Sequence, residues 1–266
     1  MRAWRQTSPA SYASPSWAKR QPWVAHPLTW LLFSALFLML VYPTTGLDQR
    51  LIAPYFDAAH QQFSLKHHWL LESILHNGLK YCLLVVALST LLISLIGNLY
   101  APYKAHQSRL LLVFVMMLTS TGLVALIKHN SMHGCPNDLI QYGGTLPYLQ
   151  LFDALPLGTA MGKCFPGGHA SGGFALMAFY IVFRDVEPKF SQAMLMLALS
   201  LGMVMGWAQM MRGEHFLSHT LWSGWLVWAI CLACQRIWFL SRLSPNAVSK
   251  HSQQKAAKPI KSLESQ

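Results

Sequence analysis

Long apolar runs separated by short polar segments dominate this chain. Six runs are candidates for membrane helices, because a membrane-spanning helix needs roughly 20 mostly apolar residues. They cover Leu28–Tyr42, Cys82–Leu99, Leu110–Ile127, Gly172–Phe183, Ala193–Met210 and Leu221–Leu240. The fourth run reaches that length only with the glycine-rich stretch before it, and a buried half-helix is the alternative there. The pattern predicts an all-α polytopic membrane protein, a six-transmembrane-helix bundle.

The polar segments divide the chain into three parts. Residues 1–26 form a polar tail, 27–240 form the six-span domain, and 241–266 form a basic tail. Between the first two runs, the spacing of the apolar residues predicts an amphipathic helix at the membrane interface. These residues are Phe63, Trp69, Leu70, Leu71, Ile74 and Leu75. The longest loop between spans covers 128–168, and long loops in compact proteins are commonly functional.

Composition supports a membrane protein and gives its orientation. The chain is 53% hydrophobic and only 11% charged, whereas soluble domains carry about 25% charged residues. With both the N- and C-termini cytoplasmic, 14 of the 20 Lys and Arg residues lie on the cytoplasmic side and six on the other, as the positive-inside rule requires. The net charge of +11 is therefore mainly a topology signal. Because the basic residues form no stripe with interleaved aromatics, we expect the lipid bilayer and not a nucleic acid as partner.

Four polar side chains fall at the outward ends of the third to sixth spans: Lys128, His169, Arg212 and His219. His169 follows Pro166-Gly167-Gly168 and precedes an apolar helix. Main-chain N–H groups at such a helix start attract anions. Taken singly, the glycine-rich stretch could be an ordinary junction, and each cation could simply extend to the interface. Together they predict a site for a phosphate-sized anion.

The three segments Lys128-x6-Cys135-Pro136, Pro166-Gly167-Gly168-His169 and Arg212-x6-His219 resemble the type 2 phosphatidic acid phosphatase superfamily. That family has the ordered motifs Lys-x6-Arg-Pro, Pro-Ser-Gly-His and Ser-Arg-x5-His-x3-Asp, and its membrane branch has six spans. The resemblance covers roughly residues 110–240. The chain departs from the family where Cys135 replaces Arg, Gly167 replaces Ser, Met211 replaces Ser and Ser223 replaces Asp, and its last spacing is one residue longer.

The resemblance implies a covalent mechanism. His219 would attack phosphorus to form a phosphohistidine, and His169 would protonate the leaving oxygen and then help to activate water. Lys128, Arg212 and the amides near Gly167 and Gly168 would hold the phosphoryl oxygens, with no metal or other cofactor. The group that orients His219 stays open: Ser223, Asp138 and Glu214 are the candidates.

The five cysteines fall into two groups. Cys82, Cys231 and Cys234 lie within predicted spans and are expected to be small apolar residues. Cys135 and Cys164 share the long outward loop, and each lies beside a motif. In an oxidising compartment they could form a disulfide that links the two motifs, in place of the lost arginine.

Two functions from different classes remain. The first is an integral membrane phosphatase or phosphotransferase that acts on a lipid phosphate or pyrophosphate at the periplasmic leaflet of a bacterial-type inner membrane, without an obligatory protein partner. The second is a non-enzymatic carrier or lipid-binding protein that retains the fold, and the replacements at Cys135, Gly167 and Ser223 favour it.

Overall fold

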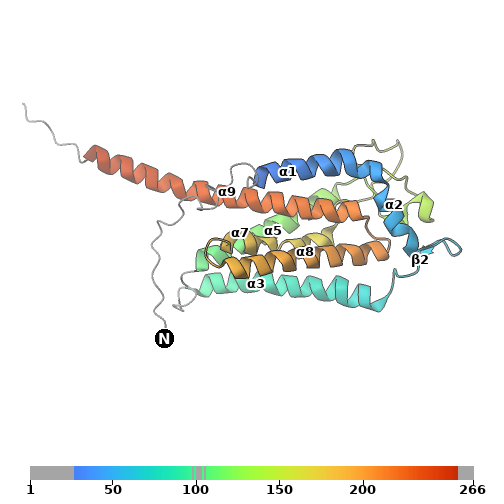
Figure 1. The fold of residues 1–266 in the computed structure, drawn as a ribbon, viewed down its shortest axis with the longest axis horizontal. Helices are drawn as coiled ribbons and strands as arrows, with labels where there is room; N and C mark the ends of the chain where they lie inside the picture. Colours follow the sequence, from blue (N-terminus) through green and yellow to red (C-terminus); the bar gives the residue numbers. More distant parts are fainter. Residues whose placement is uncertain (1–26, 98, 100–103, 105, 257–266) are drawn as a thin grey trace, which may run out of the picture.

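A computed structural model gives the fold and describes residues 27–97, 99, 104 and 106–256, with 242–256 as main chain alone. Helices lie side by side in a bundle, and the last one, α9, extends beyond the others at one end (Figure 1). Residues 1–26 and 257–266 lie outside the described residues, so the N-terminal tail and the end of the basic tail stay predictions. Residues 241–256 of the basic tail predicted for 241–266 belong to the last helix.

The described part of the chain is mostly helical. In chain order its elements are α1 (Pro27–Leu36), η3 (Phe37–Val41), η4 (Tyr42–Thr45), α2 (Leu47–Ile52), η5 (Ala53–Tyr55), β1 (Phe56–Asp57), β2 (Gln62–Phe63), η6 (Leu70–Gly78), α3 (Leu79–Ile96), α5 (Gln107–His129), η7 (Pro136–Asp138), η8 (Ile140–Tyr142), α6 (Gly168–Phe174), α7 (Met177–Phe183), α8 (Pro188–Met211) and α9 (Leu217–Ala256). The strands β1 and β2 pair antiparallel as a small hairpin.

Five helices within the described residues are long and apolar enough to cross a membrane. They are Leu28–Thr45, Leu70–Ile96, Gln107–His129, Pro188–Met211 and Leu217–Ser241. The fourth predicted span is the shorter pair α6–α7, Gly168–Phe183, so the structure supports five of the six long spans. Most residues of this pair are buried, as expected for a central helix surrounded by the others.

Close contact between α6 and α8 explains why the central segment is rich in glycine. A β-carbon added to Gly173 would lie 2.6 Å from the main-chain nitrogen of Gly202. Small residues allow helices in membranes to approach closely and gain van der Waals contact. Around this contact, the apolar core is formed mainly by side chains of α5, α6, α7, α8 and α9.

The helix predicted around Trp69–Leu75 is present, but it is continuous with the second long helix. Residues from Leu70 onward belong to the second long helix, as the π-helical stretch η6 that continues into α3. The preceding segment folds into α2 and the β1–β2 hairpin at one end of the bundle (Figure 1). An amphipathic pattern and the first turns of a spanning helix look alike when the polar residues there face a site.

The functional motifs meet at the end of the bundle that carries α2 and the hairpin. The ends of α5 and α8 and the starts of η6, α6 and α9 converge there (Figure 1). The connection between α7 and α8 lies at the other end, where Arg184 donates a hydrogen bond to Gln235 of α9 at 3.5 Å. Counting spans therefore predicted correctly which helix ends share a face.

Candidate active site

The turn between α8 and α9 places the third motif. Gly213 has φ = +73°, a left-handed conformation that favours glycine after a helix end. The Gly213 N–H donates to the Met210 carbonyl at 3.0 Å, and the Glu214 N–H donates to the Gln209 carbonyl at 2.9 Å. This pair of hydrogen bonds ends α8 at Met211 and turns the chain sharply into α9.

The start of α9 is held by a carboxylate from a distant segment. Asp48 of α2 accepts hydrogen bonds from the Ser218 N–H at 2.9 Å and the Ser218 hydroxyl at 2.5 Å, and Tyr42 donates to it at 2.7 Å. A negative charge near a helix N-terminus is favourable. Burial raises the pKa of Asp48, although the hydrogen bonds from Ser218 and Tyr42 oppose this shift. The contact fixes the helix start that carries His219.

Two imidazoles of this segment contact each other. The Nδ1 atoms of His215 and His219 lie 3.3 Å apart, and both side chains are buried. His219 also has a hydrogen bond to the main chain of Cys164. Burial lowers the pKa of His215 well below the ordinary value, and electrostatic interactions with His219, Lys128, His169 and His76 lower it further. His215 is therefore a neutral imidazole that lies close enough to the other site residues to interact with them electrostatically.

The first and second motifs also come together. A β-carbon on Gly168 would lie 3.8 Å from Cδ of Lys128, so this lysine side chain runs along the glycine-rich stretch. The Gly167 N–H donates to the His219 carbonyl at 3.0 Å, which joins the second motif to the third. Of the two glycine amides predicted to bind phosphate, that of Gly167 is thus already paired within the protein.

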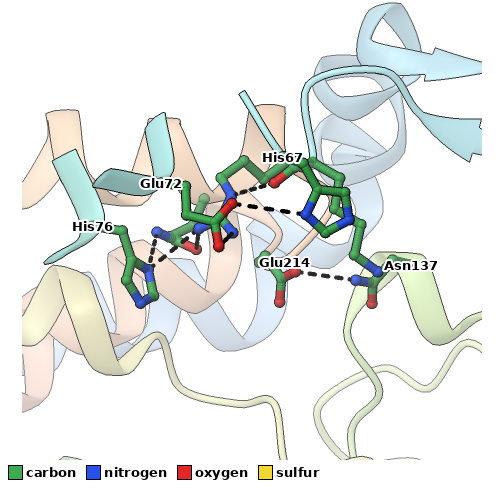
Figure 2. A network of polar contacts seen from close by, with 8 residues as sticks. His67, Glu72, His76, Asn137 and Glu214 are labelled. Atoms are coloured by element: carbon green, nitrogen blue, oxygen red, sulfur yellow. Dashed lines mark hydrogen bonds and ion pairs between the residues drawn. The ribbon is translucent and has the colours of Figure 1, made fainter. Parts of the chain in front are cut away.

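Arg212 is almost fully buried, with 6% of its surface exposed. Its Nε donates to the Lys66 carbonyl at 2.8 Å, and its two terminal nitrogens lie 3.3 Å from His76 Nδ1 and 3.8 Å from a carboxylate oxygen of Glu72. Figure 2 shows this network, in which Glu72 also lies 3.7 Å from His67. The contacts of the two terminal nitrogens are longer and therefore weaker than good hydrogen bonds.

His76 comes from η6 and reaches the second motif. Its ring centroid lies 3.7 Å from that of His169. Gln209 donates to His76 Nδ1 at 2.9 Å. His169 itself has a buried Nδ1 with no hydrogen-bond partner among the described residues. The second span thus contributes to the site an imidazole that lies in none of the three sequence motifs.

The structure joins Cys135 and Cys164 in a disulfide. Sγ of Cys164 lies 3.3 Å from His215 Nδ1 and 3.0 Å from the Glu214 carbonyl oxygen, so the bridge packs against the third motif. Cys135, Cys164 and His215 form the group of metal-binding residue types whose ligand atoms lie within 4.8 Å of one another. Because metals bind thiolates, two sulfurs bonded to each other leave this group only one imidazole ligand.

None of the three side chains predicted to orient His219 is seen to pair with its ring: two have other hydrogen-bond partners, and the third is exposed. The Ser223 hydroxyl contacts two main-chain carbonyls, those of His219 and Gly167, at 2.7 and 2.8 Å. Asn137 donates to the Glu214 carboxylate at 3.2 Å (Figure 2). Asp138 is exposed at the surface. The side chain that pairs with the His219 ring is His215.

Residues 109–253 match the family model of the PAP2 superfamily. The chain belongs to the PAP2 superfamily. Among solved structures, this PAP2 chain is similar to the crystal structure of the first transmembrane PAP2 type phosphatidylglycerolphosphate phosphatase from Bacillus subtilis. The identity is 16% and the TM-score 0.46, over 79% of this chain and 94% of that chain. No curated protein matches the chain.

The sequence did carry a signal for His215. Written as Gln209-x5-His215-x3-His219, the segment fits both spacings of the PAP2 motif Arg-x5-His-x3-Asp. Gln209 then takes the place of the arginine and His219 the place of the aspartate. Because residues four apart lie on one face of a helix, His215 and His219 were both plausible from spacing alone. The signal for His76 was weaker, since no motif includes the second span.

Proposed function

We propose that this protein is a membrane phosphatase or phosphotransferase that removes a phosphoryl group from a lipid phosphate or pyrophosphate through a phosphohistidine. The observation that carries the proposal is the convergence of Lys128, His169, Arg212 and two paired imidazoles at one end of the helix bundle. Membership in the PAP2 superfamily supports the phosphatase class. Cations and N–H groups aimed at a phosphoryl group stabilise the charge that develops in transfer.

Of the two imidazoles in the third motif, we propose His215 as the attacking group in place of His219. A neutral His219 that donates its N–H to the Cys164 main chain accepts, at its other nitrogen, the Nδ1–H of His215. The Nε2 lone pair of His215 is then free to attack phosphorus. His169 protonates the leaving oxygen and afterwards helps to activate water, while Lys128 and Arg212 bind the phosphoryl oxygens.

The location of the site supports a lipid-borne substrate on the outer side of the membrane. The site lies where spanning helices end, so a lipid headgroup can reach it by lateral diffusion. A disulfide beside it suits an oxidising compartment such as the periplasm. Most Lys and Arg residues would then lie on the opposite, cytoplasmic side. Phosphatidic acid, phosphatidylglycerol phosphate, undecaprenyl pyrophosphate and lipid A phosphates are the substrates to test.

The test measures phosphate release by the purified protein in detergent, with a metal chelator present, from these four lipid phosphates. We expect release from at least one. His215→Ala should lower kcat at least about a thousandfold, and His219→Ala by a smaller factor, because the nucleophile matters more than the group that orients it. Absence of release from all four would reject the proposal and favour the non-enzymatic alternative.

Covalent labelling separates the two histidines. With substrate carrying labelled phosphate and a rapid quench, the wild type and His219→Ala should retain acid-labile label on the protein, and His215→Ala should not. The reverse pattern would assign the attack to His219, as the sequence predicts. Phosphate release that is lost in the presence of the chelator and restored by added metal would contradict the metal-free chemistry.

A further inference from the structure

His76 lies outside all three motifs and yet contacts two of them. It occupies the π-helical stretch η6, at the start of the second long helix. π-Helical turns are rare and occur frequently at functional sites, where they redirect a side chain. Here the side chain that enters the site is an imidazole whose ring packs against that of His169, at an angle of 36°, and contacts Arg212.

The partners of His76 fix which of its nitrogens carries the proton. Nδ1 lies 2.9 Å from Nε2 of Gln209 and 3.3 Å from a terminal nitrogen of Arg212. Both partners are donors and a guanidinium cannot accept, so Nδ1 is an acceptor. A neutral His76 therefore has its proton on Nε2. Figure 2 shows this second nitrogen pointing away from the network at Nδ1.

When His215 is aligned with the motif histidine, neither of the two positions at which the PAP2 motifs have arginine carries a cation. Cys135 stands at one of these positions, and Gln209 stands at the other. Gln209 is the residue that holds His76. The ring of His76 and the unpartnered, buried Nδ1 of His169 lie together at the same point, which indicates that a ligand completes the hydrogen bonding there.

We propose that His76 is a third phosphoryl-binding residue, which donates its Nε2–H to a nonbridging oxygen of the substrate's phosphoryl group beside Lys128 and Arg212. This rests on the proposed function and extends it to a residue of the second span. The site would thus replace a lost arginine by an imidazole held in one tautomer by Gln209 and Arg212.

A purely structural role for His76, as an anchor for Gln209 and Arg212, is the competing explanation. Two substitutions separate the roles because each keeps a different nitrogen's function. In His76→Asn, the short amide can keep an acceptor near the position of Nδ1 but has no donor at the position of Nε2. In His76→Gln, the longer amide can place an N–H near Nε2. His68→Asn, at an exposed histidine of the preceding segment, is the control.

The experiment compares these variants with the wild type in two measurements. The first is kcat/KM for phosphate release from whichever of the four lipid phosphates the wild type hydrolyses. The second is the inhibition constant of inorganic orthovanadate, together with its protection against thermal unfolding. Loss of one hydrogen bond to a charged group predicts, for His76→Asn, a fall of about 10- to 100-fold in kcat/KM and a rise by the same factor in the inhibition constant of orthovanadate. We expect partial recovery in His76→Gln and wild-type values in His68→Asn.

The outcomes decide between the roles. Values for His76→Asn within about twofold of the wild type, or equal losses in His76→Asn and His76→Gln, would overturn the proposal. If the wild type releases phosphate and binds orthovanadate while His76→Asn is unaffected, only the role of His76 fails. If the wild type neither releases phosphate nor binds orthovanadate, the proposed function fails and this inference fails with it.

Discussion

The pairing of two buried histidines gives the third motif properties that a histidine–carboxylate pair does not have. A carboxylate can only accept, so it holds its imidazole partner in the tautomer whose N–H faces it, whereas in a pair of neutral imidazoles one must donate and the other accept. In this chain the main chain of Cys164 supplies the missing constraint by pairing with His219. An aspartate would also stabilise a charged imidazole, so we expect the His215–His219 pair to need both rings neutral before the attack on phosphorus.

The lowered pKa of His215 makes folding stability depend on pH. Burial is the main cause, and electrostatic interactions with His219, Lys128, His169 and His76 act in the same direction. The folded pKa lies below the unfolded value near 6.5. The contribution of His215 to the free energy of unfolding is therefore fully present above about pH 6.5. It is lost as the pH falls toward the folded pKa, because in that range only the unfolded chain takes up the proton.

We therefore expect the thermal unfolding midpoint in detergent to fall as the pH is lowered from 7 to 5, and to fall less in His215→Gln. One titrating group changes the unfolding free energy by up to about 1.4 kcal/mol per pH unit. His129→Gln, at an exposed position, controls for the loss of one imidazole. Parallel curves for the wild type and His215→Gln would show that His215 is not the neutral, buried group described above.

At the scale of elements, close packing of the central helix determines where His169 lies. α6 follows directly from the glycine-rich motif, and its Gly173 touches the main chain at Gly202 of α8. Backbone contacts of this kind cannot relax by a side-chain movement. The position of His169 relative to the third motif is thus set partly by two glycines at this helix crossing.

A matched pair of glycine substitutions tests this packing. Gly173→Ala places a β-carbon 2.6 Å from a main-chain atom of Gly202, and overpacking of this kind costs about 1–3 kcal/mol of folding free energy. We expect a lower unfolding midpoint and lower activity. Gly122→Ala in α5 meets nothing within 4 Å, and should keep or raise the midpoint because alanine favours helix by about 1 kcal/mol. Equal midpoints in the two variants would contradict a rigid contact between α6 and α8.

At the scale of the whole molecule, the sequence predicts which parts meet but not how each side chain is used. Hydropathy located the long helices, and counting them placed Lys128, His169, Arg212 and His219 at one end. The short α6–α7 segment was predicted as a full span because composition does not show that neighbouring helices surround it. The choice between His215 and His219 needed the fold, since residues four apart share a helix face. His76 was missed because its contacts with Gln209 and His169 join segments far apart in the chain.

The Cys135–Cys164 disulfide links these scales, because it closes the long loop between α5 and α6 and also packs against His215. A bridge with a sequence separation of 29 stabilises the folded state by roughly 3–4 kcal/mol in the chain-entropy model. The double variant Cys135→Ser/Cys164→Ser should therefore unfold at a lower temperature. Its phosphate release should fall even below that midpoint, since the support of His215 is lost.

The control is Cys82→Ala, which removes an exposed free cysteine of α3 and should leave both measurements unchanged. A thiol reductant added to the wild type should reproduce the double variant, and adding it to the double variant should have no effect. If the double variant unfolds earlier but keeps wild-type kcat/KM, the bridge serves the loop alone and His215 is positioned by α9. If neither measurement changes, the bridge is dispensable for both, and the contacts of Asp48 and Gly167 with the start of α9 are sufficient to hold the third motif.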